Sequence, residues 1–501
     1  MSKLAWSEID WNLIQRRISR QQRRVYKASI ERNKEKIHAI QLRIICSLDS
    51  KLLAIRQVIT NKKKLISHEK KVELAYQLKL NFDRKKVIIS HEKSRFQSLN
   101  ISNIQDQAEQ IIVKLALEPE WEALFEPNSY GFRPGRSCHD LIATILFSLK
   151  KKSRYLIKVN LQKCFYSMDF EKLFKKMSTF NLIEYQLEFW LKRGLMNNFQ
   201  NRRNEVFQKL KSQFRNNIIS SLLLNITLHG LANYIRNWYK SIWYSTKGKN
   251  FKIGKYNKKI IFGLSRYAND FIIITSIIIN IHEIKTQVAI WLYNDTGITL
   301  SKSKIKIINS NEGFELIGFR IITIKNQSTK KYKIKIYPSR SSRISIIHCV
   351  HNLIQENKSI SVYSLITLLS IKIIVWANYY RFSECKKDLS KIDYFIFNQI
   401  RSWILRKKSK GLISGKKIKL KYFPKGNIYN FRGKNFKNNW ILNGKTRTKN
   451  GGIRENFLPK MVWVNSSKYI KIKAKASPYN DSNLYWTQRL QKYYKFNYVY
   501  N

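Results

Sequence analysis

The fold is decided by the stretch Ile260-Ile-Phe-Gly-Leu-Ser-Arg-Tyr267-Ala268-Asn269-Asp270-Phe271-Ile-Ile-Ile-Thr275. Two apolar, β-rich runs flank a short polar step, which predicts a strand, a tight turn and a second strand, with Asn269 and Asp270 at the tip. An acid at the tip of a hairpin between buried strands can present its carboxylate to Mg²⁺. The alternative is an ordinary hairpin in which Asn and Asp serve only as turn residues.

Three more stretches stand out upstream of this hairpin. Tyr155-Leu-Ile-Lys-Val-Asn160-Leu-Gln-Lys-Cys164-Phe165-Tyr-Ser-Met-Asp169 predicts a strand that ends at a polar residue and leads into a helix. The others are Tyr130-Gly-Phe-Arg-Pro-Gly-Arg-Ser137-Cys-His-Asp140 and Ser220-Ser-Leu-Leu-Leu-Asn225-Ile-Thr-Leu-His229-Gly230. In this order the four stretches resemble motifs of the reverse transcriptases encoded inside group II introns. The stretch at 130–140 resembles that family's fingers signature and is the most specific match.

The departures from the family pattern carry the functional prediction. In that family two palm motifs read Asp-Ile-Lys-Gly-Cys-Phe-Asp and Tyr-Ala-Asp-Asp-Phe. The resemblance therefore places the family's two main metal-binding carboxylates at Asn160 and Asn269 of this chain. Only Asp270 remains acidic. Two Mg²⁺ ions about 3.5–4 Å apart need anionic oxygens, and an Asn carbonyl can coordinate Mg²⁺ but cancels no charge. The family's Pro-Gln-Gly-Gly also aligns with Phe214-Arg215-Asn216-Asn217. We therefore predict vestigial metal positions, no catalytic residue and no bound metal or cofactor.

Composition indicates a folded protein with a polyanionic partner. The chain has 501 residues, 44% of them hydrophobic, which is enough for several domains with sizeable cores. Its net charge of +63 favours nucleic acid as the partner. We expect no membrane partner, because the most apolar run, residues 271–281, is shorter than the roughly 18 residues that span a bilayer. The five cysteines lack paired spacing, which predicts reduced thiols.

Two basic regions in the first third of the chain are candidate RNA contacts. Residues 6–47 predict helix, in which Arg16, Arg20 and Arg23 lie beside an apolar stripe. These cations suit phosphate oxygens, although a solvated charged face is equally compatible with the pattern. In the fingers signature, Arg133 and Arg136 flank a Pro-Gly turn and could clamp a phosphate. The alternative for that turn is a loop that maintains the fold.

The last third of the chain predicts three amphipathic helices, at 344–354, 361–380 and 389–406. The run Val375-Trp376-Ala377-Asn378-Tyr379-Tyr380-Arg381-Phe382 resembles the maturase-specific domain of the same family. There Tyr379, Arg381, Lys407 and Lys408 are candidate RNA contacts, whereas Trp376 and Tyr380 suit core packing. Residues 477–489 resemble the segment that precedes the family's nuclease. The last His is His351 and the last Cys is Cys385, so the residues after Cys385 cannot build a zinc-dependent nuclease.

The resemblance covers nearly the whole chain and implies an α+β fold. We expect right-hand polymerase-like fingers and palm with an antiparallel sheet, followed by an α-helical thumb/maturase domain. The predicted domains are an N-terminal basic helical region at 1–64, degenerate fingers and palm at 65–325, maturase-specific helices at 326–425 and a basic tail at 426–501.

The implied function is that of a group II intron maturase. Such a protein binds intron RNA and assists its folding and splicing without being an enzyme, and it needs no small-molecule substrate. The alternative is an active RNA-directed DNA polymerase that supports intron mobility, in which Asp270, with Asp169 or another acid, rebuilds the metal site. A degenerate product without a role is a third possibility. The Ile-, Lys- and Asn-rich composition is typical of an A+T-rich gene and favours an organelle-encoded protein. The resemblance favours the plastid (chloroplast), where organelle-encoded maturases of this family are familiar, with the mitochondrion as the alternative.

Overall fold

The computed structural model describes most of the chain in two compact units. Described are residues 5–62, 66–78, 80, 99–149, 154–161, 168–196, 218–247, 262–275, 281–300, 305–328, 331–407, 420–448, 451–473, 475–480, 484–487 and 489. The first unit comprises Met1–Thr144, Leu156–Ile307 and Lys471–Asn501, and the second comprises Ile145–Tyr155 and Ile308–Ile470. The described residues after Ile470 thus cluster with the first unit and not with the segment that precedes them. The predicted domain limits stay predictions.

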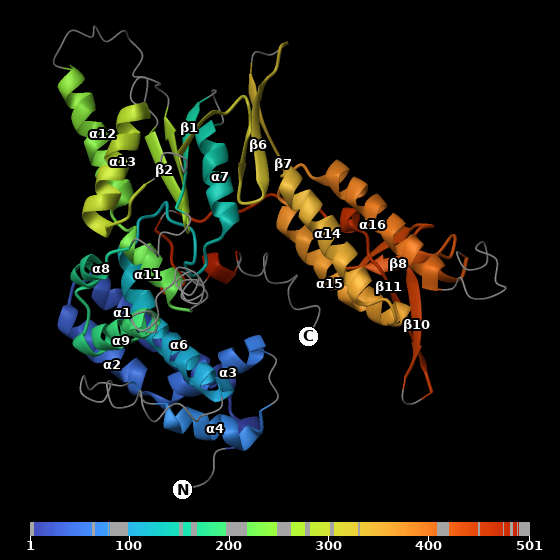
Figure 1. Cartoon of the computed structure of the whole chain (residues 1–501), viewed down its shortest axis with the longest axis horizontal. Coiled ribbons are helices and arrows are strands. Elements are labelled where there is room, and N and C mark those ends of the chain that lie inside the picture. The colour runs from blue at the N-terminus through green and yellow to red at the C-terminus, as the bar shows by residue number, and fades with distance from the viewer. Residues whose placement is uncertain are drawn as a thin grey trace. The chain divides into compact units, whose positions relative to one another are not determined.

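The N-terminal part of the first unit is helical, as the sequence predicts (Figure 1). Its elements are η1 (Trp6–Glu8), α1 (Trp11–Ile30), α2 (Lys34–Cys46), α3 (Leu48–Lys62), α4 (His68–Gln77) and α6 (Leu99–Leu124). Asp10 begins α1 as its N-cap, because its side chain accepts hydrogen bonds from the backbone N–H groups of Asn12 and Leu13. Helix α6 is the centre of this region, since α1, α2 and α3 all pack against it.

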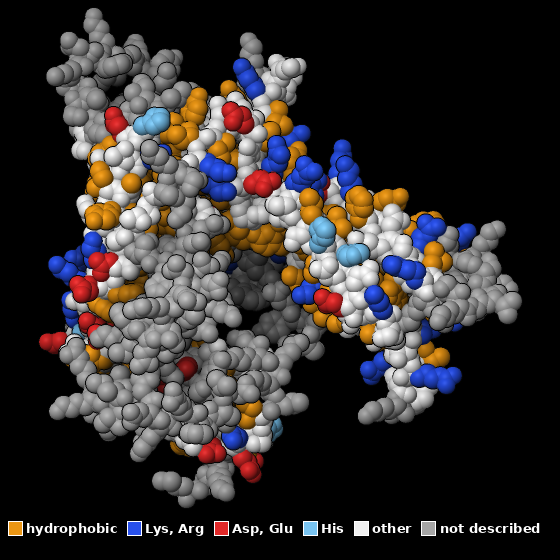
Figure 2. All heavy atoms as spheres, in the orientation of Figure 1, with side chains coloured by type: hydrophobic (Ala, Val, Ile, Leu, Met, Phe, Trp, Pro, Cys, Tyr) orange, Lys and Arg blue, Asp and Glu red, His pale blue; other side chains and the backbone are white. Residues whose placement is uncertain are grey.

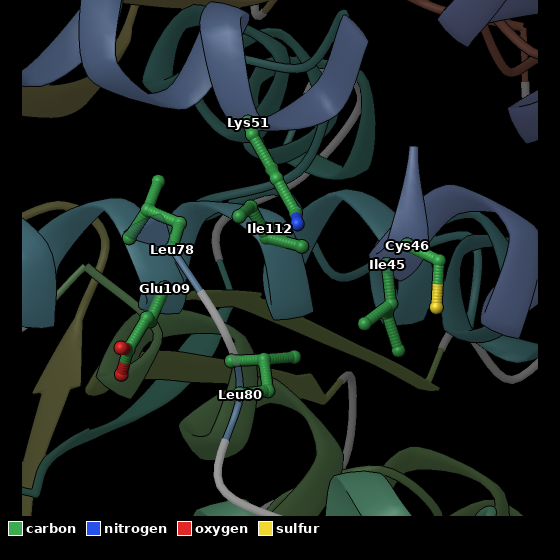
Figure 3. A pocket seen from close by; sticks show the side chains of 7 residues that line it. All are labelled: Ile45, Cys46, Lys51, Leu78, Leu80, Glu109 and Ile112. Carbon is green, nitrogen blue, oxygen red and sulfur yellow. The ribbon is translucent and has the colours of Figure 1, made fainter. Parts of the chain in front are cut away.

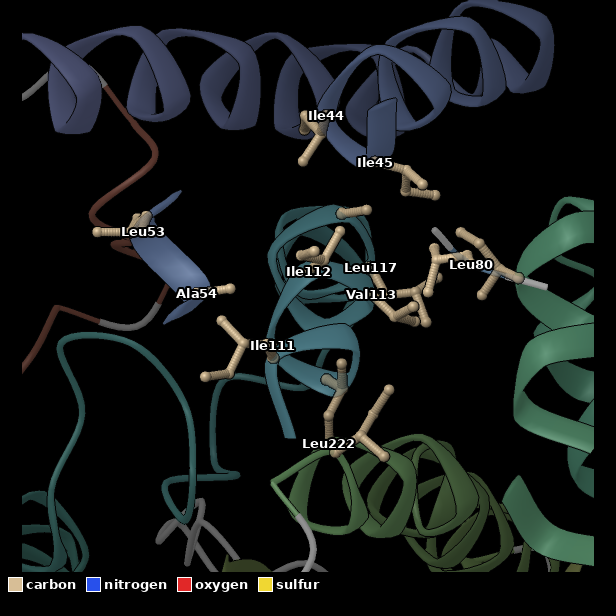
Figure 4. Close-up of a cluster of buried hydrophobic side chains, with 14 of the residues drawn as sticks. Ile44, Ile45, Leu53, Ala54, Leu80, Ile111, Ile112, Val113, Leu117 and Leu222 are labelled. Carbon is tan, nitrogen blue, oxygen red and sulfur yellow. The ribbon is translucent and has the colours of Figure 1, made fainter. Parts of the chain in front are cut away.

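The core of this region is apolar and continuous around α6 (Figure 4). Figure 4 shows Ile111, Ile112 and Leu117 of α6 among side chains of α2, α3 and the helix α11 (Ser220–Thr227). Each of these three is at least nine-tenths buried. Burying an aliphatic side chain of this size contributes about 1.5–3 kcal/mol, so the many members of this cluster fix the position of α6.

The central sheet of the first unit confirms the hairpin prediction. Its strands lie in the order β2 (Phe262–Tyr267), β3 (Asp270–Thr275), β1 (Tyr155–Asn160) and β4 (Ile305–Asn309). β2 and β3 pair antiparallel, with Tyr267 opposite Asp270. The turn between them is made by Ala268 and Asn269, so Asp270 is the first residue of β3 and does not lie at the tip, where the sequence predicts it. β1 ends at Asn160, as predicted.

Helices lie around this sheet (Figure 1). They are α7 (Cys138–Leu149), α8 (Phe170–Met177), α9 (Asn181–Met196), α12 (Leu231–Lys247) and α13 (Ile281–Thr296), together with α11. α12 packs on β2 and on α13. Strand β3 has its residues Phe271 to Ile274 buried without alternation, which is typical of a strand covered on both faces.

Among the described residues, the second unit contains a small sheet, helices and two β-hairpins. The sheet has the order β5 (Phe314–Leu316), β6 (Phe319–Lys325) and β7 (Tyr332–Pro338). The three predicted helices are confirmed as α14 (Arg340–Glu356), α15 (Val362–Tyr380) and α16 (Lys386–Lys407). The segment that we expect to be a tail contains the hairpins β8 (Ile428–Phe431) with β9 (Lys434–Lys437) and β10 (Asn443–Arg447) with β11 (Ile453–Phe457), and then η5 (Met461–Trp463). β10, β11 and η5 pack on α15.

Helix α15 corrects the expectation that no apolar run is long enough to span a bilayer. By length and composition it qualifies, with 19 residues and a mean hydropathy of 1.5, and it is the one such helix among the described residues. Its buried side chains, among them Leu365, Leu369 and Ile373, recur at helical spacing. These residues belong to the core of the second unit, where α15 packs against α14, β10 and β11.

The turn between β5 and β6 is held against α15 by hydrogen bonds. Ile317 and Gly318 connect β5 to β6 with φ values of 48° and 77°, which is the left-handed geometry of a two-residue hairpin. Tyr379 and Tyr380 of α15 donate hydrogen bonds from their hydroxyls to the carbonyl oxygens of Ile317 and Gly318, at 2.9 and 3.0 Å. A Cβ atom on Gly318 would lie 2.6 Å from the Tyr380 hydroxyl.

We therefore predict that Gly318→Ala destabilises the protein more than Gly433→Ala does. Gly433 has nearly the same φ, 75°, but nothing within 4 Å of a Cβ there, so the control isolates the backbone cost of about 1–2 kcal/mol. The measurement is the free energy of unfolding from urea titrations followed by circular dichroism. Equal losses for the two variants would contradict the close packing of Gly318 against Tyr380.

Candidate functional site

The hairpin tip and the end of β1 form one polar site. The Leu161 N–H donates to the Asn269 carbonyl at 2.9 Å, and the Asn160 side-chain amide donates to Asp270 Oδ1 at 2.6 Å. The structure therefore brings together the three positions that the sequence assigns to the vestigial metal site. Phe214–Asn217 lie outside the described residues.

Burial dominates the electrostatics of this site. It raises the pKa of the Asp270 carboxyl above its usual range, while nearby Lys158 and the hydrogen bond from Asn160 act in the opposite direction. The oxygen of the Asn160 amide, Oδ1, is buried and has no hydrogen-bond partner among the described residues. The site thus holds one carboxylate, and one oxygen of that carboxylate is already engaged by an amide.

The acid that could have rebuilt a metal pair is used elsewhere. Asp169 is the N-cap of α8, where its side chain accepts hydrogen bonds from the backbone N–H groups of Glu171 and Lys172. Among the described residues, no group of three or more His, Cys, Asp or Glu side chains could hold a metal ion. The arrangement can hydrogen-bond, but it lacks the paired carboxylates that two-metal chemistry requires.

The predicted phosphate clamp in the fingers signature is wrong, and the alternative of a fold-maintaining loop describes it. Arg133 is buried and makes a bidentate pair with Glu122, at 2.7 and 2.8 Å, while its third nitrogen donates to the carbonyls of Glu126 and Ser129. Arg136 is also buried and donates to the Pro127 carbonyl. Burial, followed by the charge of Arg133, lowers the pKa of Arg136 to about 10. Neither guanidinium is available to an RNA phosphate.

The sequence reasoning missed a second buried ion pair on the same signature. Asp140 Oδ2 accepts a hydrogen bond from Arg489 Nη2 at 2.6 Å, and Asp140 Oδ1 accepts one from the Ile472 N–H at 2.8 Å. A Cβ atom on Gly135 would lie 2.5 Å from the Trp486 ring. The C-terminal segment therefore packs directly on the fingers signature. The resemblance of residues 477–489 to a family motif was the signal that could have indicated this contact.

The arginines of α1 lie where RNA could reach them. Arg16, Arg20 and Arg23 are exposed, whereas Ile14, Ile18 and Val25 face the core. Their contact with RNA stays a prediction.

The candidates of the maturase-like region fall in different places. Arg381 is only 6% exposed and lies 4.6 Å from the Phe382 ring centroid, so its prediction as a surface contact is wrong. Tyr379 is partly buried, stacks on Phe319 and donates its hydroxyl to Ile317. Lys407 is the last residue of α16, with a side chain that the structure does not describe, and Lys408 lies outside the described residues. Tyr380 is a core residue, as predicted.

Two pockets are lined by residues other than those of the polar site. One, of about 260 Å³, is lined mainly by apolar side chains of the N-terminal helices, and Lys51 and Glu109 are its charged residues (Figure 3). The other, of about 470 Å³, is an open depression lined by Ile317, three serines of α14 and Trp376, Tyr379 and Tyr380 of α15. None of the predicted metal positions lines either pocket.

Comparison with protein families gives three matches along the chain. Residues 6–78 match the N-terminal domain of reverse transcriptase, and residues 83–321 match reverse transcriptase (RNA-dependent DNA polymerase). Residues 345–423 match the group II intron, maturase-specific domain. Residues 424–501 lie outside these three matches.

Several proteins of similar sequence are named as maturase-like or intron-encoded proteins. Maturase-like protein 1 of Euglena gracilis is 24% identical over 454 residues, which is 86% of this chain and 89% of that protein. Maturase-like protein 1 of Euglena longa is 24% identical over 459 residues, covering 87% of this chain and 91% of that protein. The group II intron-encoded protein LtrA of Lactococcus lactis subsp. cremoris is 23% identical over 295 residues, or 50% of this chain and 48% of that protein.

The polar site yields a prediction about Asn160. Asn160→Asp replaces the amide donor with a second carboxylate beside Asp270, and the two negative charges should repel each other. Asn160→Ala removes the hydrogen bond at a cost of about 1–3 kcal/mol but adds no charge. In EDTA at pH 8 the Asp variant should therefore have a lower melting temperature than the Ala variant. Mg²⁺ should restore part of the loss in the Asp variant only. Thermal unfolding followed by circular dichroism measures both effects. An Asp variant as stable as wild type in EDTA would show that the hydrogen bond from Asn160 to Asp270 does not stabilise the site.

Proposed function

Because the chain belongs to the family of group II intron reverse transcriptases and maturases, we propose that it binds a group II intron RNA and assists its folding and splicing without catalysing DNA synthesis. Its fold is that of the family, with polymerase-like fingers and palm and a helical maturase-specific region. In this proposal the palm is a scaffold, and the chemistry of splicing resides in the RNA.

The observation that carries the proposal is the hydrogen bond between Asn160 and Asp270. It occupies the place where two-metal catalysis needs a pair of carboxylates, and it satisfies the remaining acid without a cation. Asp169, the other acid of the motif, caps a helix. An RNA-binding role needs neither group, because phosphate contacts depend on surface cations.

Charge and relatives support RNA as the partner. The net charge of +63 suits a polyanion, and Figure 2 shows Lys and Arg side chains over the described surface of the second unit, with few Asp and Glu side chains among them. The relatives are named for maturase-like and intron-encoded proteins. We place the protein in an organelle on the basis of its composition, and in the plastid before the mitochondrion on the basis of the family resemblance.

The alternative function is an active RNA-directed DNA polymerase, and the retention of Asp270 is what favours it.

We predict that the purified chain shows no template-directed DNA synthesis in a primer-extension assay with Mg²⁺ or Mn²⁺, because the palm has one carboxylate where the chemistry needs two. Steady nucleotide incorporation that disappears in Asp270→Ala would overturn this part of the proposal.

A further prediction concerns the exposed face of α1. Changing Arg16, Arg20 and Arg23 together to Gln should weaken binding to structured RNA and reduce the slope of log affinity against log salt by about 2–3, because up to three phosphate contacts are lost. The matched control changes the same three residues to Lys, which keeps the charge and should keep most of the slope. Filter binding between about 50 and 200 mM salt measures it. If the Gln and Lys variants share the wild-type slope, α1 is only a solvated helix.

A further inference from the structure

The third helix of the second unit has one face packed in the core and one face open to solvent. Helix α16 packs against α14 and η5, and it runs beside α14 in Figure 1. Its buried side chains recur at helical spacing: Leu389, Ile392, Ile396, Ile400, Trp403 and Ile404. The opposite face carries Lys387, Lys391, Tyr394, Phe395 and Arg401, all of them exposed. We call these five residues the α16 stripe.

The charge of the α16 stripe is entirely positive, because both acids of the helix are used inside the fold. Asp388 pairs with Arg343 of α14 at 2.7 Å. Asp393 accepts hydrogen bonds from the backbone N–H groups of Met461 and Val462, at 2.9 and 3.1 Å. In the part of the chain that the structure describes, no ion pair engages Lys387, Lys391 or Arg401. Their charges are therefore free to meet a polyanion.

Two aromatic side chains lie exposed in the middle of these cations. Tyr394 is 64% exposed and Phe395 is 52% exposed, with ring centroids 6.2 Å apart. Lys391 lies one helical turn before both rings, and Arg401 lies two turns after Tyr394. Trp403 of the same helix shows the contrasting case, since its ring is buried. Large rings left in water beside free cations are typical of an interaction surface and not of a solvated charged face.

We propose that the α16 stripe binds an unpaired segment of RNA, with Tyr394 and Phe395 stacking on its bases and the three cations contacting its phosphates. This inference rests on the proposed RNA-binding function and gives it a site. In a duplex the base faces are covered by their neighbours, so rings of this kind gain little there. In a loop or bulge the bases can leave their own stack and stack on aromatic rings, and each stacked base contributes about 1–3 kcal/mol to binding.

The test compares two RNAs on the full-length chain. One is a fluorescein-labelled single strand of about 20 nucleotides without self-complementarity, long enough to cover a typical single-strand site, and the other is the same strand annealed to its complement. The double variant Tyr394→Ala/Phe395→Ala should bind the single strand about thirtyfold more weakly than wild type or worse, because two stacking contacts are lost. It should bind the duplex nearly as wild type does. Fluorescence anisotropy at one fixed salt concentration measures both affinities.

Matched variants separate stacking from loss of fold. Tyr394→Phe/Phe395→Tyr keeps both rings and should keep wild-type affinity for both RNAs. Tyr76→Ala removes a ring that is 56% exposed on α4, outside the stripe, and should have no effect. An unchanged affinity of the Ala double variant for the single strand, or an equal loss on both RNAs, would overturn the stacking role. A wild-type chain that binds neither RNA would refute the proposed function itself.

Discussion

A buried carboxylate on α6 holds the first unit together around its most specific motif. Glu122 lies near the end of the central helix and neutralises Arg133 of the fingers signature, with Arg136 close by. On the other side of the same turn, Asp140 is paired with Arg489 of the C-terminal segment. Removing one partner of such a buried pair costs about 3–5 kcal/mol, because the other charge is left without compensation. The turn is therefore fixed from both sides by charge pairs that water cannot replace.

The sheet of the first unit brings the predicted vestigial metal positions together around a hydrogen bond between two side chains. β1 and the β2–β3 hairpin still bring Asn160, Asn269 and Asp270 to one place. In an active metal site, two like charges would repel each other unless a cation lay between them. Here an amide takes the place of one carboxylate and donates to the other, so repulsion becomes attraction. A sheet of this kind can serve as a rigid support without any bound metal.

The basic surplus of the chain has two different uses. Arg133, Arg136, Arg381 and Arg489 are buried, and their charges belong to the interior. Arg16, Arg20 and Arg23 of α1 and the cations of the α16 stripe are exposed to solvent. Arg is suited to both uses, because its planar guanidinium makes several directed hydrogen bonds in the interior and matches phosphate oxygens at the surface.

The sequence by itself determined part of the secondary structure and its order, but not the two hairpins between Ile428 and Phe457. Period-two and period-3.6 patterns found the hairpin at 260–275, the strand that ends at Asn160 and the three helices of the second unit, because local backbone preference and amphipathicity are written in neighbouring residues. The resemblance also predicts that two carboxylates of the family are absent from the palm. Only the tertiary structure decided which cations are buried, that Ile472, Trp486 and Arg489 pack on the fingers signature, and that the apolar helix α15 has its partners inside the protein. These outcomes depend on contacts between residues far apart in the chain, as between Asp140 and Arg489, and no local pattern records which distant residue will supply the matching charge or surface.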